Sequence, residues 1–186
     1  LGLDDYQDGQ VVTPSIDTVT VLFVDQSGIS DLTGIESFSS LSYLLCSQNN
    51  LTNLDLSQNS NLIYLECYSN LLTSLNISNN LLLNYLTLSN NQLTSLDVSN
   101  NTALTLLGCH NNQLTSLDVS GCSALTDLYC ENNQLTSLDV SNNTALTLLD
   151  CHNNQLTCLN LKNGNNTNFN YMRADYNPNL NCIEVD

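Results

Sequence analysis

One stretch of 21 residues constrains the fold of this chain more than any other feature. Residues 93–113 read LTSLDVSNNTALTLLGCHNNQ, and residues 135–155 repeat them with a single change, Gly108 being replaced by Asp150. Residues 114–134, between these two stretches, keep the same spacing of apolar residues. A period this strict predicts a repeat architecture, in which each unit packs only against its neighbours.

The same spacing continues in both directions and defines eight repeats. Each repeat has apolar residues at its first, fourth and sixth positions and most have an asparagine at the ninth, as in Leu104, Leu107, Cys109 and Asn112. This pattern is typical of a leucine-rich repeat, in which a short strand turns at the asparagine. The repeats begin at Val19, Leu41, Leu62, Leu83, Leu104, Leu125, Leu146 and Phe169.

The second half of each repeat mirrors the first half, so that the unit of 21 is a nested pair of about 10 and 11 residues. So short a second half leaves no room for a helix of several turns, and its apolar spacing favours an extended segment. We therefore expect a nearly straight leucine-rich repeat solenoid with extended segments on both faces, roughly 38 Å long at about 4.8 Å per repeat. The first repeat is an exception, with one helical or 3-10 turn expected around residues 35–38.

The pattern resembles the bacterial 21-residue leucine-rich repeats of nested type, the cysteine-ladder repeats of the internalin J class, and leucine-rich surface proteins of Bacteroidetes. The resemblance extends roughly from Val19 to Val185. It implies a secreted or cell-surface protein that binds a protein or takes part in adhesion, which is an inference from the fold alone.

We divide the chain into three parts. Residues 1–18 do not fit the repeat and are expected to cap the first repeat; residues 19–168 form the repeats; residues 169–186 form a degenerate final repeat and a C-terminal cap. Asn163-Gly164 predicts a tight turn within a loop at residues 162–166. The chain begins at Leu1 instead of a methionine, from which we expect a processed boundary.

The charge of the chain excludes several classes of partner. The formal net charge is −16, and Lys162 and Arg173 are the two cationic residues apart from histidine. Binding to nucleic acid or to an anionic membrane needs basic side chains that neutralise phosphates. No apolar run of 18 residues is present, so no membrane insertion is expected. The acidic surface instead suits a cationic partner or Ca²⁺.

Two rows of asparagine are expected to bond the backbone of their own turns and to stack as ladders. The front row consists of Asn49, Asn70, Asn91, Asn112, Asn133 and Asn154. The back row consists of Asn59, Asn80, Asn101 and Asn143, and Cys122 and Gly164 interrupt it.

The eight cysteines divide into two kinds. Cys158 and Cys182 each precede an inward apolar residue on adjacent final repeats, so we expect them to form a disulfide and hence an oxidising compartment. The others are expected to be buried free thiols, because a thiol packs in an inward position as leucine does. Five of these lie at the sixth position, with Leu88 filling the gap, and one lies in the back row: Cys46, Cys67, Cys109, Cys130, Cys151 and Cys122.

The third, fifth and seventh positions of each repeat point to solvent and form the candidate binding surface. Its first half is aromatic and its second half is acidic. A contiguous patch of exposed aromatic residues indicates a contact surface, although tyrosines also stack across strands for stability alone. The ligand-binding candidates are Phe23, Tyr43, Tyr64, Tyr68, Tyr85, His110, Tyr129, Glu131 and His152, with Leu45, Asp127 and Asp150 beside them.

His110, Glu131 and His152 lie on consecutive repeats, which raises the question of a metal site. Two histidines separated by two strand spacings, near 10 Å, would converge on Zn²⁺ only under strain. No nucleophile or enclosing pocket accompanies them. We therefore predict no metal site and no catalytic residue in this row, and no enzymatic activity.

The back face has an outward row of threonines beside a row of aspartates that includes Asp97, Asp118 and Asp139. Carboxylates spaced about 5 Å apart repel one another unless each accepts a hydrogen bond from a nearby turn or they share cations. Bonding to turn amides is the main expectation, and Ca²⁺ at these three aspartates is the alternative. An ice-binding threonine face is a further alternative, which the aspartate row disfavours.

These observations predict a non-enzymatic recognition module, a monomer whose strand face binds a protein or a polysaccharide at a bacterial surface. The alternative is a rigid acidic spacer within a larger surface protein, with possible Ca²⁺ association. No other cofactor is expected.

Overall fold

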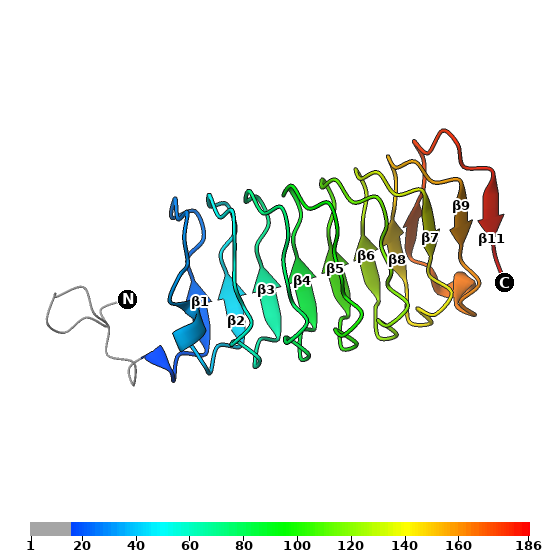
Figure 1. Ribbon diagram of the computed structural model, residues 1–186. Helices are drawn as coiled ribbons and strands as arrows, with labels where there is room; N and C mark the ends of the chain where they lie inside the picture. Colours follow the sequence, from blue (N-terminus) through cyan, green and yellow to red (C-terminus); the bar gives the residue numbers. More distant parts are fainter. Residues whose placement is uncertain (1–15) are drawn as a thin grey trace, which may run out of the picture.

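The chain winds as a parallel β-solenoid, with its repeats stacked in a single, nearly straight row (Figure 1). The computed structural model describes residues 16–186. An eight-stranded parallel sheet, the front sheet, runs along one side in the order β1-β2-β3-β4-β5-β6-β8-β10. Its strands are β1 (Val21–Phe23), β2 (Tyr43–Leu45), β3 (Tyr64–Glu66), β4 (Tyr85–Thr87), β5 (Leu106–Gly108), β6 (Asp127–Tyr129), β8 (Leu148–Asp150) and β10 (Tyr171–Arg173).

The sequence period sets the register of this sheet. Tyr43 pairs with Tyr64, and Tyr64 pairs with Tyr85, so that each position of the repeat forms a column along the rod. In this sheet the middle residue of each strand except β10 is buried and its neighbours point outward, as the alternation of side chains along a strand requires. The predicted eight-repeat solenoid is therefore confirmed.

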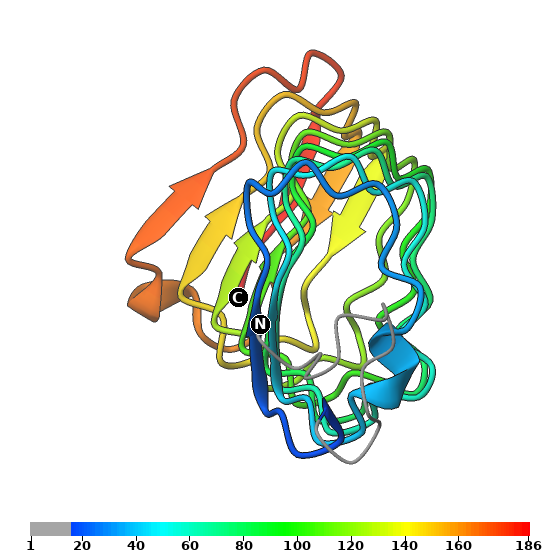
Figure 2. The ribbon, with the colours of Figure 1, turned by 90° about the vertical axis from the view of Figure 1, so that its left-hand side faces the viewer.

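Within the described part of the chain, the back side is extended but forms a sheet only towards the C-terminus. There β7 (Ser137–Asp139), β9 (Cys158–Asn160) and β11 (Cys182–Glu184) pair in the order β11-β9-β7. The earlier repeats are joined on this side at the corners, for example by the bond from the Gln113 amide to the Leu93 carbonyl, at 2.9 Å. Viewed along the rod, the two sides form the long walls of a flattened coil (Figure 2).

One continuous hydrophobic core fills the space between the two sides. Inward leucines such as Leu107 and Leu128 are completely buried. The six predicted free cysteines are buried and unpaired, as expected. Burial raises the pKa of the Cys109 and Cys151 thiols to about 12 in each case, which keeps them protonated and inert.

The front asparagine row forms the predicted ladder. The Asn112 amide donates to the carbonyls of Cys109, in its own repeat, and Leu88, in the repeat before, both at 3.0 Å. Its Oδ1 accepts the backbone N–H of Leu93 at 3.0 Å. The residue before each asparagine of this row has a positive φ, as at Asn111 (54°), and this sharp turn aims the carboxamide inward.

The back row is also buried, with two corrections to the prediction. Its amides bond the preceding repeat and not their own turns, as where Asn101 donates to the carbonyls of Ile77 and Asn80. Gly164 does not occupy this row; Asn163 does, and its amide donates to the Asn143 carbonyl at 3.1 Å. The row shifts by one residue because Gly164, with a φ of 73°, forms the tight turn predicted after Asn163. Cys122 stands in the row as expected, with its sulfur 3.6 Å from the Val98 carbonyl oxygen.

The ends of the rod depart from the regular repeat. The 3-10 turn η1 (Ile35–Ser37) lies where a single helical turn was expected, and a second, η2 (Asn166–Asn168), follows the Gly164 turn. Most of the predicted N-terminal cap lies outside the described residues. At the C-terminal end, Ile183 and Val185 remain 51% and 54% exposed. Within residues 16–186, no helix has the length and apolar character that crossing a bilayer requires.

Candidate binding surface

The front sheet arranges the predicted site residues in columns on its outer face. The third and fifth positions are the outer residues of each strand, and the seventh follows two residues after the strand. Aromatic residues gather on β1 to β4, and carboxylates and histidines gather around β5, β6 and β8. The predicted aromatic and acidic halves thus lie end to end on one face.

Three of the four tyrosines of the third column, Tyr43, Tyr64 and Tyr85, form a stacked ladder, which we call the tyrosine ladder. The ring centroids of Tyr43 and Tyr64 are 5.6 Å apart, and those of Tyr64 and Tyr85 are 4.1 Å apart with an angle of 9° between the planes. Each ring face therefore covers the next, and the edges point outward. Tyr43 is 41% exposed, and Phe23 on β1 is 68% exposed.

Polar bonds hold the aromatic half in place. The Tyr64 hydroxyl donates to the carboxylate of Glu66, two residues further along β3. Burial among its neighbours raises the pKa of Tyr64, and the bond to Glu66 adds to this effect. The Gln48 side-chain amide donates to the Tyr68 hydroxyl at 3.1 Å. The surface is preorganised as a result, since these side chains are already held before any partner binds.

In the acidic half, the carboxylate of Asp150 is buried and accepts bonds from two other side chains, with 7% of the residue's surface exposed. Its Oδ1 lies 2.6 Å from Nδ1 of His152. Its Oδ2 accepts the Tyr171 hydroxyl at 3.3 Å. This carboxylate therefore bonds side chains from its own strand region and from the next strand, β10, and it fixes the orientation of the His152 ring.

A second histidine–carboxylate pair lies on the neighbouring repeats. Nδ1 of His110 lies 3.5 Å from Oε1 of Glu131, whose side chain is 13% exposed. Burial raises the pKa of Glu131, although the nearby His110 works in the opposite direction. Tyr129, beside this pair, also has a raised pKa because of burial and of the carboxylates of Asp127 and Glu131.

The histidine row does not have the arrangement of a nucleophilic triad. Ser89 Oγ lies 2.8 Å from Nδ1 of His110, the same ring nitrogen that faces Glu131. In a triad, the hydroxyl and the acid bond opposite nitrogens of the imidazole, so that a proton can pass through the ring. Ser89 is also almost completely buried. The three groups thus lack the two-sided arrangement of a triad.

His110, Glu131 and His152 do not bring their ligand atoms together either. Among residues 16–186, the group of three potential ligands whose donor atoms lie within 4.8 Å of one another is Cys158, Cys182 and Glu184. Cys158 and Cys182, on β9 and β11, form a disulfide in the structure. The residues of the histidine row therefore contact one another and their neighbours in pairs, and they do not converge on one point.

On the back face, each aspartate of the row bonds a nearby turn. Oδ1 of Asp97 accepts the backbone N–H of Ser99 at 2.9 Å, and Oδ1 of Asp118 accepts that of Ser120 at the same distance. Asp139 makes the equivalent bond to Ser141 at 2.8 Å. Bonds to these serines lower the pKa of each carboxyl group. Turn amides thus stabilise these charges.

The structure adds apolar residues that the sequence reasoning missed. Ile63, which immediately precedes β3, is 38% exposed, and Leu81 and Leu82, in the turn that leads to β4, are 55% and 52% exposed. The signal in the sequence was the departure from the repeat, because the equivalent positions of later repeats hold threonine, serine, alanine or asparagine. These residues extend the apolar character of the aromatic half along one edge.

Comparisons with known proteins place the fold. The LVIVD repeat family matches residues 74–112 and 130–153. Internalin J of Listeria monocytogenes is 51% identical over 43 residues, which are 23% of this chain and 5% of that protein. The solved functional domain of internalin J, which includes a cysteine ladder, matches 95% of this chain and 55% of its own length, with 29% identity and a TM-score of 0.51.

Two further structures share the fold at lower identity. A leucine-rich repeat protein of Leptospira interrogans covers 95% of this chain and 47% of its own length, with 23% identity and a TM-score of 0.76. The leucine-rich repeat ectodomain of a receptor kinase from Arabidopsis thaliana covers 57% of this chain and 64% of its own, with 24% identity and a TM-score of 0.51. The chain thus spans about half of the two bacterial structures and a small part of the curated relative.

The repeat spacing, the parallel front sheet and the column of buried cysteines all agree with these comparisons. The chain has the fold of a leucine-rich repeat solenoid and is similar in sequence and in structure to the cysteine-ladder protein internalin J.

Proposed function

We propose that this chain is a non-enzymatic binding module whose front sheet recognises a protein partner at a bacterial cell surface. The observation that carries the proposal is the tyrosine ladder with Phe23 beside it, an aromatic column on the outer face of the sheet. Large exposed aromatic residues in a contiguous patch are typical of binding surfaces and of their energetic hot spots. The similarity to internalin J supports a surface location.

The stacking of the ladder favours a protein over a polysaccharide. A sugar ring packs on the free face of an aromatic ring, but both faces of Tyr64 are covered by Tyr43 and Tyr85. The ladder instead presents ring edges, which carry partial positive charge, and hydroxyl groups. Carbonyl groups and aromatic faces of a protein partner are suited to such edges.

The acidic half indicates how charge is distributed on the proposed partner and in which orientation the partner binds. Glu131, Asp127 and Asp150 lie on the same face as the ladder, in a chain with a net charge of −16. A partner with an apolar area followed by a basic area would match both halves, and its approach would be accelerated at low ionic strength.

The test uses the purified chain as immobilised bait. The proposed strand-face variant replaces Tyr43, Tyr64 and Tyr85 by serine, and the matched control replaces three outward threonines of the back face, Thr73, Thr94 and Thr115, by serine. Both baits are exposed to surface proteins and to a polysaccharide panel from the native habitat, with and without Ca²⁺. We expect the strand-face variant alone to lose its protein partner.

Equal capture by both variants would place the binding site elsewhere and refute the proposal. The fold of each variant is checked by its melting curve. Loss of two stacked tyrosine pairs should cost about 1–3 kcal/mol, because such pairs contribute about 0.5–1.5 kcal/mol each. This loss leaves the repeat core intact.

The second candidate function is a rigid acidic spacer within a larger surface protein. The unbroken asparagine ladder supports it, because it ties each repeat to the next along the rod. If the chain is a spacer of this kind, neither the unaltered chain nor either variant should capture a partner. Ca²⁺ association with Asp97, Asp118 and Asp139 belongs to this alternative, and a rise in melting temperature on adding Ca²⁺ would support it.

A further inference from the structure

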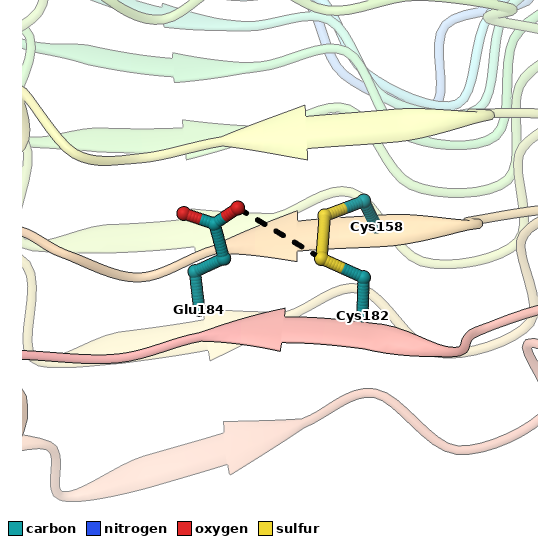
Figure 3. Close-up of side chains that lie close together, drawn as sticks. All are labelled: Cys158, Cys182 and Glu184. Carbon is teal, nitrogen blue, oxygen red and sulfur yellow. Dashed lines mark hydrogen bonds between the residues drawn. A yellow bond between two sulfur atoms is a disulfide. The ribbon is translucent and has the colours of Figure 1, made fainter.

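The C-terminal part of the back sheet brings two cysteines and a carboxylate together. Cys158 on β9 is the direct register partner of Cys182 on β11, with their Cα atoms 4.4 Å apart, and the two form a disulfide. Glu184 follows Cys182 by two residues, so both side chains lie on the same side of β11. Figure 3 shows the carboxylate turned towards the sulfur of Cys182.

The spacing of these groups suits a metal ion once the sulfur–sulfur bond is open. Oε1 of Glu184 lies 3.9 Å from Sγ of Cys182. A tetrahedral ion with bonds of about 2.3 Å to sulfur and about 2.1 Å to oxygen separates adjacent donors by roughly 3.6 Å. Neighbouring strands about 4.8 Å apart allow two thiols to separate to a similar distance without movement of the backbone.

The second oxygen of Glu184 is already used, which orients the carboxylate. Oε2 lies 2.8 Å from Nζ of Lys162, an ion pair between partly exposed side chains. Lys162 therefore leaves Oε1 directed at the sulfurs. Positioning of a ligand by an outer partner is common in metal sites and contributes to their affinity.

We propose that Cys158, Cys182 and Glu184 form a redox-gated site for a thiophilic divalent cation such as Zn²⁺. A dithiol reductant supplies two electrons and two protons, its own sulfurs become a disulfide, and the Cys158–Cys182 bond opens to two thiols. Metal binding then releases the two thiol protons to solvent and leaves two thiolates and one carboxylate as ligands. Water takes the fourth position, because three protein ligands leave a tetrahedral ion open on one side.

In the oxidised state the site should not bind such an ion, because cysteine binds metals as a negatively charged thiolate and the sulfurs of a disulfide are neutral and weak donors. The six remaining cysteines do not compete. They are buried in the core and, apart from Cys122, follow one another along a line, so that no three of them converge on one point.

The experiment measures Co²⁺ binding by the sulfur-to-cobalt charge-transfer absorption in the near ultraviolet. The chain is reduced with a dithiol, the reductant is removed under nitrogen, and Co²⁺ is titrated and then displaced by Zn²⁺. We expect one ion per reduced chain and none per oxidised chain. The double variant C158S/C182S, which keeps all six buried thiols, should show no absorption. Glu184→Gln should weaken Co²⁺ binding by at least about tenfold, and the matched control Glu66→Gln should have no effect.

Several results would overturn the proposal. These are the absence of Co²⁺ binding to the reduced chain, persistent absorption in the double variant, and unchanged affinity in Glu184→Gln. Far-UV circular dichroism checks that each variant is folded. A measurement on the unaltered chain is independent of the variants: Zn²⁺ should protect Cys158 and Cys182 of the reduced protein from iodoacetamide, as detected by mass spectrometry. Equal alkylation with and without Zn²⁺ would contradict the site.

Discussion

The two asparagine rows look alike in the sequence, but the structure predicts that they differ in their contribution to stability. Oδ1 of Asn112 in the front row accepts the backbone N–H of Leu93, whereas Oδ1 of Asn101 in the back row is buried without a hydrogen-bond partner. The Asn101 amide donates to the carbonyls of Ile77 at 3.1 Å and Asn80 at 2.9 Å. The comparison is between the losses of unfolding free energy in the variants Asn112→Cys and Asn101→Cys.

Cys122, which stands in the back row where neighbouring repeats have asparagine, indicates how much stability a cysteine loses at such a position. Its sulfur lies 3.6 Å and 3.7 Å from the two carbonyl oxygens equivalent to those that Asn101 bonds, and the thiol is completely buried. A thiol carries one hydrogen and can therefore replace one of the two bonds that the Asn101 amide donates, so Asn101→Cys should cost about 1 kcal/mol. A thiol is a poor acceptor, so Asn112→Cys also leaves the buried N–H of Leu93 unpaired.

An unpaired buried donor costs about 1–3 kcal/mol. We therefore expect Asn112→Cys to destabilise the chain by about 2 kcal/mol more than Asn101→Cys does. The measurement is urea unfolding followed in parallel by circular dichroism and tyrosine fluorescence, under conditions that keep the thiols reduced. Agreement between the two probes is required, because long repeat arrays can unfold in stages. Equal losses in the two variants, or a larger loss for Asn101→Cys, would refute the reasoning.

Three further predictions concern charge and reactivity. Burial raises the pKa of Glu131 above its ordinary value of 4.5, so the folded chain holds this proton more tightly than the unfolded chain, and stability falls as the pH rises through this range. Glu131→Gln should thus raise the urea midpoint at pH 7 but give no gain at about pH 3, and a gain of equal size at both values would contradict this. The six buried thiols, with the pKa of Cys122 raised to about 11, should resist iodoacetamide in the native protein and react fully in urea, as counted by mass spectrometry. Asp97→Asn should change the free energy of unfolding by less than about 0.5 kcal/mol, because Asn76 already makes the equivalent bond to a serine amide at 3.0 Å. A larger loss of stability would show that the charge of Asp97 itself matters.

Much of the architecture could be predicted because the repeat states the same information many times. The spacing of Leu104, Leu107 and Cys109 recurs with little change, so the inward column and the register of the front sheet follow from the period. The position of the asparagine ladder follows for the same reason. The shift from Gly164 to Asn163 in the back row could not be predicted, because it occurs once and depends on a local turn.

The candidate surface was less predictable, because it depends on side-chain conformations. The sequence placed Tyr43, Tyr64 and Tyr85 in one column, but the period does not state whether the rings turn their faces or their edges to solvent. Likewise, the alignment of His110 with Glu131 was visible, whereas the meeting of Ser89 and Glu131 at the same ring nitrogen was not. Rotamers respond to neighbours on three adjacent repeats at once, and no single repeat encodes them.

The confinement of the back sheet to the last repeats has a mechanical consequence. Near the C-terminus, adjacent repeats are held by backbone hydrogen bonds on both walls and by the Cys158–Cys182 link, whereas the middle repeats have a full ladder on the front wall alone. A load that separates the repeats meets unequal resistance along the rod. We expect adjacent repeats to separate first on the back wall between β2 and β6. The segment from β7 to β11, which is paired on both walls, should separate last.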